Sequence, residues 1–189
     1  MQRTPLIKMP KPDARDRLRR AAWGCVWLLL FRTTPIPMHR WRCFLLRLFG
    51  ADIRGRALPY PSARIWAPWN LTMMDGSCLG SHSECYNVAR VTLQPHSIIS
   101  QRVYLCTASH DLIDPGFALT AAPISIGERA WVAASAFVGP GVEMGECSMV
   151  AACAVVIRNV EACEIVGGNP AKPIGMRINH FETAETDRC

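Results

Sequence analysis

An apolar side chain recurs at every sixth position in the C-terminal half of this chain. The repeating positions are Ile126, Val132, Val138, Met144, Val150 and Val156. Each of them except the last is followed by Gly or Ala. A helix repeats near 3.6 residues and a sheet strand near 2, so neither explains this period. One large and one small residue in every six is typical of a parallel β-helix built from hexapeptides, and the pattern therefore predicts an all-β fold.

Each hexapeptide of such a fold supplies one short strand and one turn, and three hexapeptides close a triangular coil. The aliphatic side chains point inward and stack from coil to coil, while the small residue lets the chain bend at a corner. Ile157 stands where a small residue is expected. This departure lies near the C-terminal end of the coil stack, where a solenoid has to be capped.

The repeat continues towards the N-terminus with one change of frame. From about Ala51 it begins imperfectly, and a first set of positions six residues apart then comprises Ala67, Met73, Leu79 and Cys85. A second set resumes two residues out of step and comprises Leu93, Ile99 and Leu105. The slip between the two sets predicts a small outward bulge between residues 86 and 91.

No repeat is visible between Cys106 and Pro123, and the run Asp114, Pro115 and Gly116 favours a loop. A β-helix otherwise tolerates only short turns, and long interruptions of compact domains are usually functional. We therefore expect an extended loop near residues 106–123 to contribute to function.

The N-terminal 56 residues carry 13 Lys and Arg against 3 acids, whereas the rest of the chain carries 8 against 12. Residues 1–16 contain three prolines and are expected to be a poorly ordered lead-in. Residues 17–31 and 38–49 have the apolar spacing of amphipathic helices. Two interpretations are open: the helices cover the N-terminal end of the coil stack, or they attach the protein to an anionic membrane surface.

These observations divide the chain into a basic amphipathic helical extension (residues 1–50), a β-helix domain (51–166) and a C-terminal turn and tail (167–189). No apolar run approaches the roughly 18 to 20 residues that span a bilayer. With no secretory signal expected either, we predict a cytoplasmic protein. No nucleic-acid-binding motif accompanies the basic extension, so no nucleic-acid partner is expected.

His110 stands at the start of the interrupting loop and is the first candidate for catalysis. An imidazole with its ordinary pKa of about 6.5 is largely neutral near pH 7 and can take a proton from a hydroxyl group. Asp111 and Asp114 follow it before Pro123. Asp111 can accept a hydrogen bond from a nearby backbone N–H.

The hexapeptide array, the pair Tyr86-Asn87, the segment TASHD (107–111) and the segment GNPAKP (168–173) together resemble the left-handed β-helix O-acetyltransferases. This family includes galactoside, maltose and nodulation-factor acetyltransferases. Residues 41–51 and 99–111 carry a closer similarity to the colanic acid biosynthesis acetyltransferases. The resemblance covers nearly the whole chain. It implies a left-handed parallel β-helix, a homotrimer, and acetyl-CoA bound in a groove between neighbouring subunits.

The resemblance also implies roles for single residues. His110 matches the family's general base, and Asn87 matches an asparagine that helps to hold the acceptor near that base. Ala134 matches the position whose backbone N–H faces the thioester oxygen, so its side chain is not required. The other positions that match the acetyl-CoA groove are Trp131, Ala152, Ile157, Arg158 and Lys172. No metal ion is required for this chemistry.

The activity implied is O-acetylation of a sugar hydroxyl in an exopolysaccharide or its lipid-linked precursor, with acetyl-CoA as donor. Two kinds of alternative stay open from the sequence. One is an N-acyltransferase of the same fold that acts on amino sugars or on xenobiotics. The other is a trimeric β-helix without catalytic activity that serves as a scaffold or binding module.

Overall fold

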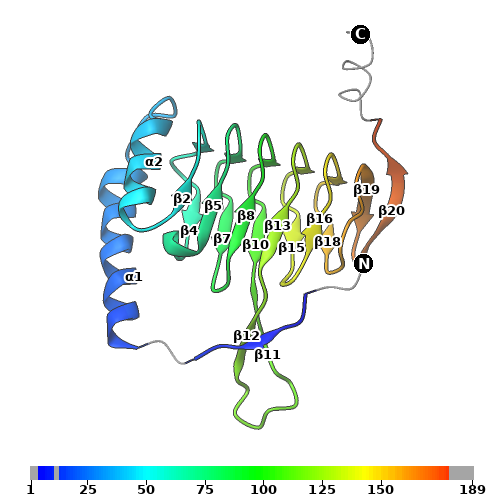
Figure 1. Ribbon diagram of the computed structural model, residues 1–189, viewed down its shortest axis with the longest axis horizontal. Helices are drawn as coiled ribbons and strands as arrows, with labels where there is room; N and C mark the ends of the chain where they lie inside the picture. Colours follow the sequence, from blue (N-terminus) through cyan, green and yellow to red (C-terminus); the bar gives the residue numbers. More distant parts are fainter. Residues whose placement is uncertain (1–3, 11–12, 179–189) are drawn as a thin grey trace.

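The protein is described by a computed structural model that covers residues 4–10 and 13–178. It is a prism of stacked triangular coils with two helices at one end (Figure 1). Three parallel sheets form the three faces of the prism. The predicted fold, a left-handed parallel β-helix of hexapeptide repeats with a short N-terminal helical segment, is confirmed.

We number the faces in the order in which the chain meets them. The first face holds β2 (Asp52–Ile53), β5 (Leu71–Met73), β8 (Val91–Leu93), β13 (Ile124–Ile126) and β16 (Glu143–Met144). The second face holds β3 (Leu58–Pro59), β6 (Cys78–Leu79), β9 (Ile98–Ile99), β14 (Trp131–Val132), β17 (Met149–Val150), β19 (Glu164–Gly168) and β20 (Ala171–Met176). The third face holds β4 (Arg64–Ile65), β7 (Glu84–Tyr86), β10 (Tyr104–Cys106), β15 (Phe137–Val138) and β18 (Val155–Val156).

The core is a column of one inward side chain per strand, as the period of six predicts. On the third face this row is fully buried and consists of Ile65, Cys85, Leu105, Val138 and Val156. Burial raises the pKa of the Cys85 thiol to about 12, so the thiol stays neutral and packs as a small apolar group. The corners are equally tight, because a Cβ added to Gly127 would lie 2.6 Å from the backbone of Gly145 in the next coil.

Departures from the period share one corner, where the third face leads into the first; we call it the insertion corner. In the first coil it carries a 3₁₀ turn, η2 (Pro68–Asn70). In the second coil it carries residues 87–90, which confirms the bulge predicted there. In the third coil it carries the long interruption between β10 and β13. The other two corners keep the short hexapeptide turn.

The long interruption is a hairpin rather than an irregular loop. Its strands β11 (Ala108–His110) and β12 (Leu119–Ala121) pair antiparallel and project from the coil stack (Figure 1). A further strand, β1 (Ile7–Lys8), pairs antiparallel with β12. The expectation of a poorly ordered N-terminal lead-in is therefore wrong for these residues. A two-residue strand has no readable periodicity, and its partner lies more than a hundred residues away in the sequence.

Residues 4–10, which we call the N-terminal strap, run across the hairpin before the chain enters the helices (Figure 1). The backbone N–H of Thr4 donates to the carbonyl of Gly141, and its hydroxyl donates to Glu143 Oε1 at 2.9 Å. At the other end of the strap, Met9 N–H donates to the Leu119 carbonyl at 2.9 Å. The strap thus ties the hairpin to the coil stack.

The helical extension consists of α1 (Ala14–Val26), a π-helical turn η1 (Trp27–Phe31) and α2 (His39–Leu48). Its inner face packs on the first coil. The indole of Trp23 is buried and donates to the Ile65 carbonyl at 2.7 Å, and that of Trp27 donates to the Ala63 carbonyl at 2.8 Å. The helices therefore cap the core, as one of the two interpretations predicts. Because cap and coils share one core, the division of the chain at residue 50 stays a prediction.

At the opposite end the chain turns at Asn169-Pro170, and β20 returns antiparallel to β19. The sequence predicts the turn but not the strand that follows it. Residues 179–189 of the predicted tail lie outside the described part of the chain.

One buried cation holds the cap together. Arg42 on α2 is fully buried, and its Nε donates to the Pro59 carbonyl of the first coil at 2.8 Å. Its Nη1 donates to Thr34 Oγ1 at 2.7 Å and to the Pro35 carbonyl at 2.8 Å, and its Nη2 donates to the Ile36 carbonyl. A single guanidinium therefore donates to the hydrogen-bond acceptors of the turn between the helices and joins that turn to the coil.

We predict that Arg42→Met lowers the free energy of unfolding by about 3 kcal/mol, because several buried acceptors lose their donor. Arg40→Met is the matched control, since Arg40 is exposed on the same helix and should change stability by less than about 0.5 kcal/mol. Urea denaturation measures both. Equal midpoints for the two variants would contradict the role assigned to Arg42.

Candidate active site

His110 lies at the end of β11 with its ring fixed from two sides. Its Nδ1 is 2.8 Å from the carbonyl oxygen of Phe117, and its ring stacks on the Phe117 ring with centroids 4.4 Å apart and planes within 8°. A carbonyl oxygen can only accept a hydrogen bond, so this contact places the proton on Nδ1. The lone pair is left on Nε2 of an exposed imidazole, which is the form a general base requires.

The group that orients His110 is thus the backbone carbonyl of Phe117 and not the carboxylate of Asp111 or Asp114. Asp111 Oδ1 accepts from Ile113 N–H at 3.0 Å, which is the bond to a nearby backbone N–H predicted for this residue. Asp114 Oδ1 accepts from Gly116 N–H at 2.8 Å, and its other oxygen forms an ion pair with Lys8. Every residue has a carbonyl, so no sequence signal could have singled out this one.

The turn of the hairpin sets the position of that carbonyl. Phe117 has a φ of +48°, in the left-handed region that bulky residues rarely adopt, and its N–H donates to the Asp114 carbonyl at 2.8 Å. The ion pair with Lys8 holds the same turn from the strap and lowers the pKa of Asp114. The N-terminal strap, the turn and the imidazole therefore form one chain of contacts.

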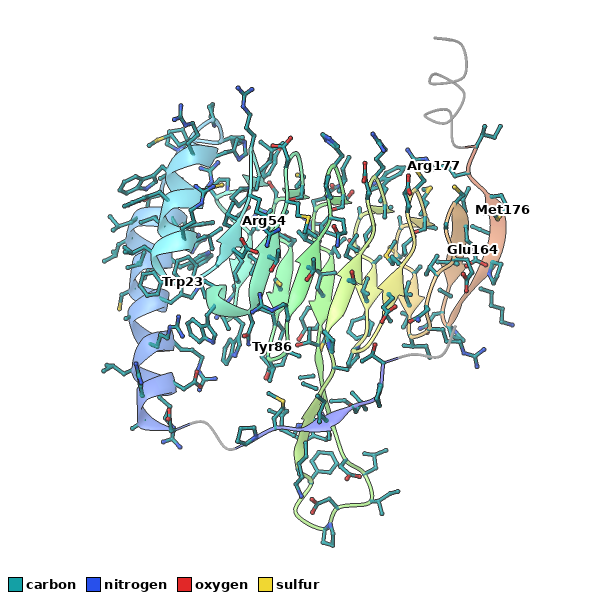
Figure 2. The ribbon with its side chains drawn as sticks, viewed as in Figure 1. Trp23, Arg54, Tyr86, Glu164, Met176 and Arg177 are labelled. Carbon is teal, nitrogen blue, oxygen red and sulfur yellow. The ribbon has the colours of Figure 1, made fainter. Side chains whose placement is uncertain are left out.

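A cavity of about 550 Å³ adjoins this hairpin, between α1, the strap and the insertion corner. Leu119 lines it and is also the residue that pairs with His110 across the hairpin. Figure 2 shows Tyr86, another lining residue, on the side of the coil stack that α1 and the hairpin flank. The cavity therefore adjoins the strand pair that carries His110, although His110 itself is not one of its lining residues.

Aromatic rings and charged groups alternate around the cavity. Trp66 and Tyr86 meet edge to face at 5.2 Å, and the Arg20 guanidinium lies 5.3 Å from the Trp66 ring. Arg20 also pairs with Asp16 at 2.8 Å. The remaining aromatic and acidic lining residues include Trp69 and Asp13. No local sequence pattern marks this cavity, because its lining comes from the helical extension, the strap, two coils of the insertion corner and the hairpin.

Asn87 lies behind the wall of this cavity. Its side chain is fully buried; Oδ1 accepts from Ala67 N–H at 2.9 Å, and Nδ2 donates to the Ala67 carbonyl at 2.7 Å. Its own carbonyl accepts from Asn70 Nδ2 at 3.1 Å. Both polar groups of the amide thus join the first and second coils at the insertion corner, where Ala67 and Val88 line the cavity. In this arrangement Asn87 shapes the cavity wall rather than facing into the cavity.

Three of the residues matched to the acetyl-CoA groove lie together at the C-terminal end of the stack. Ile157, Arg158 and Lys172 line a cavity of about 290 Å³. Glu161 and Glu164 line the same cavity, so its two cations face two carboxylates. Exposed cations at the end of a cleft suit the binding of phosphate groups.

The other three groove residues lie along the coils. Ala134 and Ala152 occupy the same corner in successive coils, and Cys153 N–H donates to the Ala134 carbonyl at 3.0 Å. The N–H of Ala134 itself donates to no residue within the described part of the chain. Trp131 lies on the outside of the second face, where its indole donates to Ser100 Oγ at 2.8 Å. It lines a separate cavity of about 430 Å³.

Comparison with known proteins assigns the chain to a family. No protein-family profile matches it. It is 41% identical to a protein of Escherichia coli strain K12 described as a putative colanic acid biosynthesis acetyltransferase, WcaF, over 82% of this chain and 86% of the relative. The chain belongs to the hexapeptide-repeat acetyltransferases. A putative acetyltransferase of Schizosaccharomyces pombe is 31% identical to this acetyltransferase over 59% of the chain and 49% of the relative.

Solved structures of low sequence identity share the fold. A hexapeptide-repeat acetyltransferase of Vibrio cholerae, crystallised with acetyl-CoA, aligns with a TM-score of 0.79 and 21% identity over 90% of this chain and 93% of that one. A maltose O-acetyltransferase of Clostridium difficile aligns with a TM-score of 0.74 and 19% identity over 88% and 90% of the two chains. The fold resemblance noted from the sequence is thereby confirmed.

In a single chain of this acetyltransferase the candidate residues lie in two separate regions. His110 and the cavity wall held by Asn87 lie at the insertion corner. The cavities lined by Trp131 and by Arg158 with its neighbours do not include His110. A single chain therefore carries His110 on the hairpin beside one cavity, and elsewhere the residues matched to the donor groove.

The ion pair between Lys8 and Asp114 should stabilise the turn that carries Phe117. We predict that Lys8→Ala speeds amide hydrogen exchange at Gly116 and Phe117 by about twofold to fivefold, as expected for loss of an exposed ion pair. Arg54→Ala is the matched control, because it breaks the exposed pair with Asp52 on the first coil, where Figure 2 labels Arg54. An equal effect of the two variants on the hairpin amides would contradict the coupling.

Proposed function

We propose that this protein transfers the acetyl group of acetyl-CoA to a hydroxyl group of a saccharide. The observation that carries the proposal is the aromatic and acidic cavity, one lining residue of which, Leu119, is the strand partner of His110. The apolar faces of a sugar ring stack on aromatic side chains, and its hydroxyls hydrogen-bond to carboxylates and guanidinium groups. Trp66, Trp69, Asp13 and Arg20 supply that combination.

The chemistry follows from the tautomer of His110. Nε2 removes the proton of the acceptor hydroxyl while its oxygen bonds to the thioester carbonyl carbon. The free N–H of Ala134 is the donor we assign to the oxyanion that develops on the carbonyl oxygen. The carbon–sulfur bond then breaks, and the imidazolium returns its proton to the departing CoA thiolate. An acetyl ester and CoA are the products.

The donor residues imply that the site is completed by a second copy of the chain. Because His110 projects on a hairpin and lines neither donor cavity, we infer a homotrimer in which the hairpin of one subunit reaches the donor groove of its neighbour. Arg158 and Lys172 would hold the CoA phosphates at the end of that groove. The Vibrio cholerae structure with acetyl-CoA supports the choice of donor.

For the acceptor we propose an exopolysaccharide repeat or its lipid-linked precursor, on the strength of the similarity to the colanic acid biosynthesis acetyltransferase. Acetyl-CoA is a cytoplasmic metabolite, so the reaction is placed in the cytoplasm, at the inner face of the membrane where a lipid-linked saccharide is presented.

We predict that His110→Ala lowers the rate of CoA release with a saccharide acceptor by about 10² to 10⁴, because the alcohol loses its general base. His82→Ala is the matched control and should keep the full rate, since His82 occupies an exposed corner of the coil stack. A thiol-release assay across a saccharide panel measures both. An unchanged rate for His110→Ala, with unchanged folding by circular dichroism, would remove His110 from the mechanism.

Trp69→Ala should raise KM for the saccharide by about tenfold and leave KM for acetyl-CoA unchanged, because of the two substrates only the acceptor loses a stacking surface. Trp41→Ala, an indole on the outer side of the helical extension, is the control. The product distinguishes O- from N-acyl transfer, since mild alkali hydrolyses an ester and spares an amide. An alkali-stable product would contradict the O-acetyltransferase assignment.

A further inference from the structure

The helical extension has an apolar outer face as well as an apolar inner one. Its inner residues, such as Trp23, are buried against the first coil (Figure 2). On the outside, Leu18 is 72% exposed, Leu29 65%, Phe44 52% and Leu48 67%. Further exposed apolar residues of the same segment are Leu28, Leu30, Ile36, Met38 and Trp41. So many large apolar side chains on one exposed segment mark an interaction surface.

These residues form one connected surface because α1 and α2 lie antiparallel. Near the end of α2, Phe49 packs on Trp23 of α1 with ring centroids 5.2 Å apart. Near its start, the Trp41 indole donates to the Leu30 carbonyl at 2.9 Å and its ring stacks on Phe44 at 5.7 Å. We call the exposed side chains of Leu18, Leu29, Leu30, Trp41, Phe44 and Leu48 the outer apolar face.

The charges around the outer apolar face all have one sign. Residues 17–51 contain seven arginines and no acidic residue. Arg42 is buried and Arg47 donates to the Ile53 carbonyl of the first coil, but Arg17, Arg32 and Arg40 are exposed. Arginines that flank a face of Leu, Phe and Trp are the composition of helices that lie in the interface of an anionic bilayer. In the part of the chain that the structure describes, no helix is long and apolar enough to span a bilayer.

We propose that the outer apolar face docks on the surface of an anionic lipid bilayer, with the coil stack standing away from the membrane. Figure 1 shows both helices at one end of the stack, so docking leaves the hairpin and the faces of the prism uncovered. The inference deepens the proposed function by placing the enzyme where a lipid-linked saccharide is presented. It does not depend on catalysis, since neither His110 nor the acceptor cavity takes part in docking.

Flotation of the full-length protein with vesicles tests the proposal. We expect binding to vesicles of phosphatidylcholine with 30% phosphatidylglycerol (about one lipid in three, enough for the anionic surface potential of a cytoplasmic leaflet), and weaker binding to phosphatidylcholine alone. Raising the salt concentration should reduce the difference between the two, because it screens the arginines. Phe44→Ser with Leu48→Ser should lower the partition coefficient by about tenfold or more.

Met176→Ser with Ile174→Ser is the matched control, because these exposed apolar residues lie on β20 at the opposite end of the stack; binding should be unchanged. His110→Ala should bind vesicles like the wild type even where it abolishes acetyl transfer, which separates the two proposals. Absence of binding to either vesicle, or full binding by the Phe44 and Leu48 variant, would overturn the inference. Analytical ultracentrifugation without lipid gives a further test. If the Phe44 and Leu48 variant were a smaller oligomer than the wild type, the outer apolar face would join copies of the chain, and the inference would be overturned.

Discussion

The whole structure depends on the stacking of one aliphatic side chain per strand into a closed column. Successive coils lie so close that a methyl group on Gly127 would meet the backbone of the next coil. A chain under this constraint cannot insert a residue within a strand without moving an inward side chain to the outside. Extra residues therefore leave the prism at corners. This protein concentrates them at a single corner, the one between its third and first faces.

That concentration produces the cavity that we propose as the acceptor site. The η2 turn of the first coil, the short bulge of the second coil and the hairpin of the third coil lie one above the other along the insertion corner. The amide of Asn87 links the first two through Ala67, and the strap with Lys8 holds the third. With α1 closing the remaining side, the three insertions enclose the cavity. The regular coils hold the hairpin and the cavity wall in place, and the irregular corner carries the residues that we propose for catalysis.

The sequence was sufficient for the parts of the fold that repeat. The six-residue period predicted the inward row from Met73 onward, although it assigned Ala67 to the row in place of Ile65. The frame slip predicted the bulge before Val91, and the missing repeat located the hairpin. It was not sufficient where structure depends on pairs of distant residues. The strand that pairs Ile7 with Ala121 has no local pattern, and the cavity brings together residues as far apart as Asp13 and Leu119. The Asn87 amide, which the resemblance matches to a residue that holds the acceptor, hydrogen-bonds to both backbone groups of Ala67, and no sequence pattern predicts these bonds.

The account of catalysis depends on one hydrogen bond, from His110 Nδ1 to the Phe117 carbonyl, because this bond leaves the lone pair on Nε2. Nitrogen-15 NMR of the labelled imidazole in its neutral form reports directly which ring nitrogen carries the proton. The structure predicts a proton on Nδ1 and a bare Nε2 in a single dominant tautomer. A proton on Nε2, or an even mixture of the two tautomers, would show that the hairpin does not prepare this histidine to act as a base.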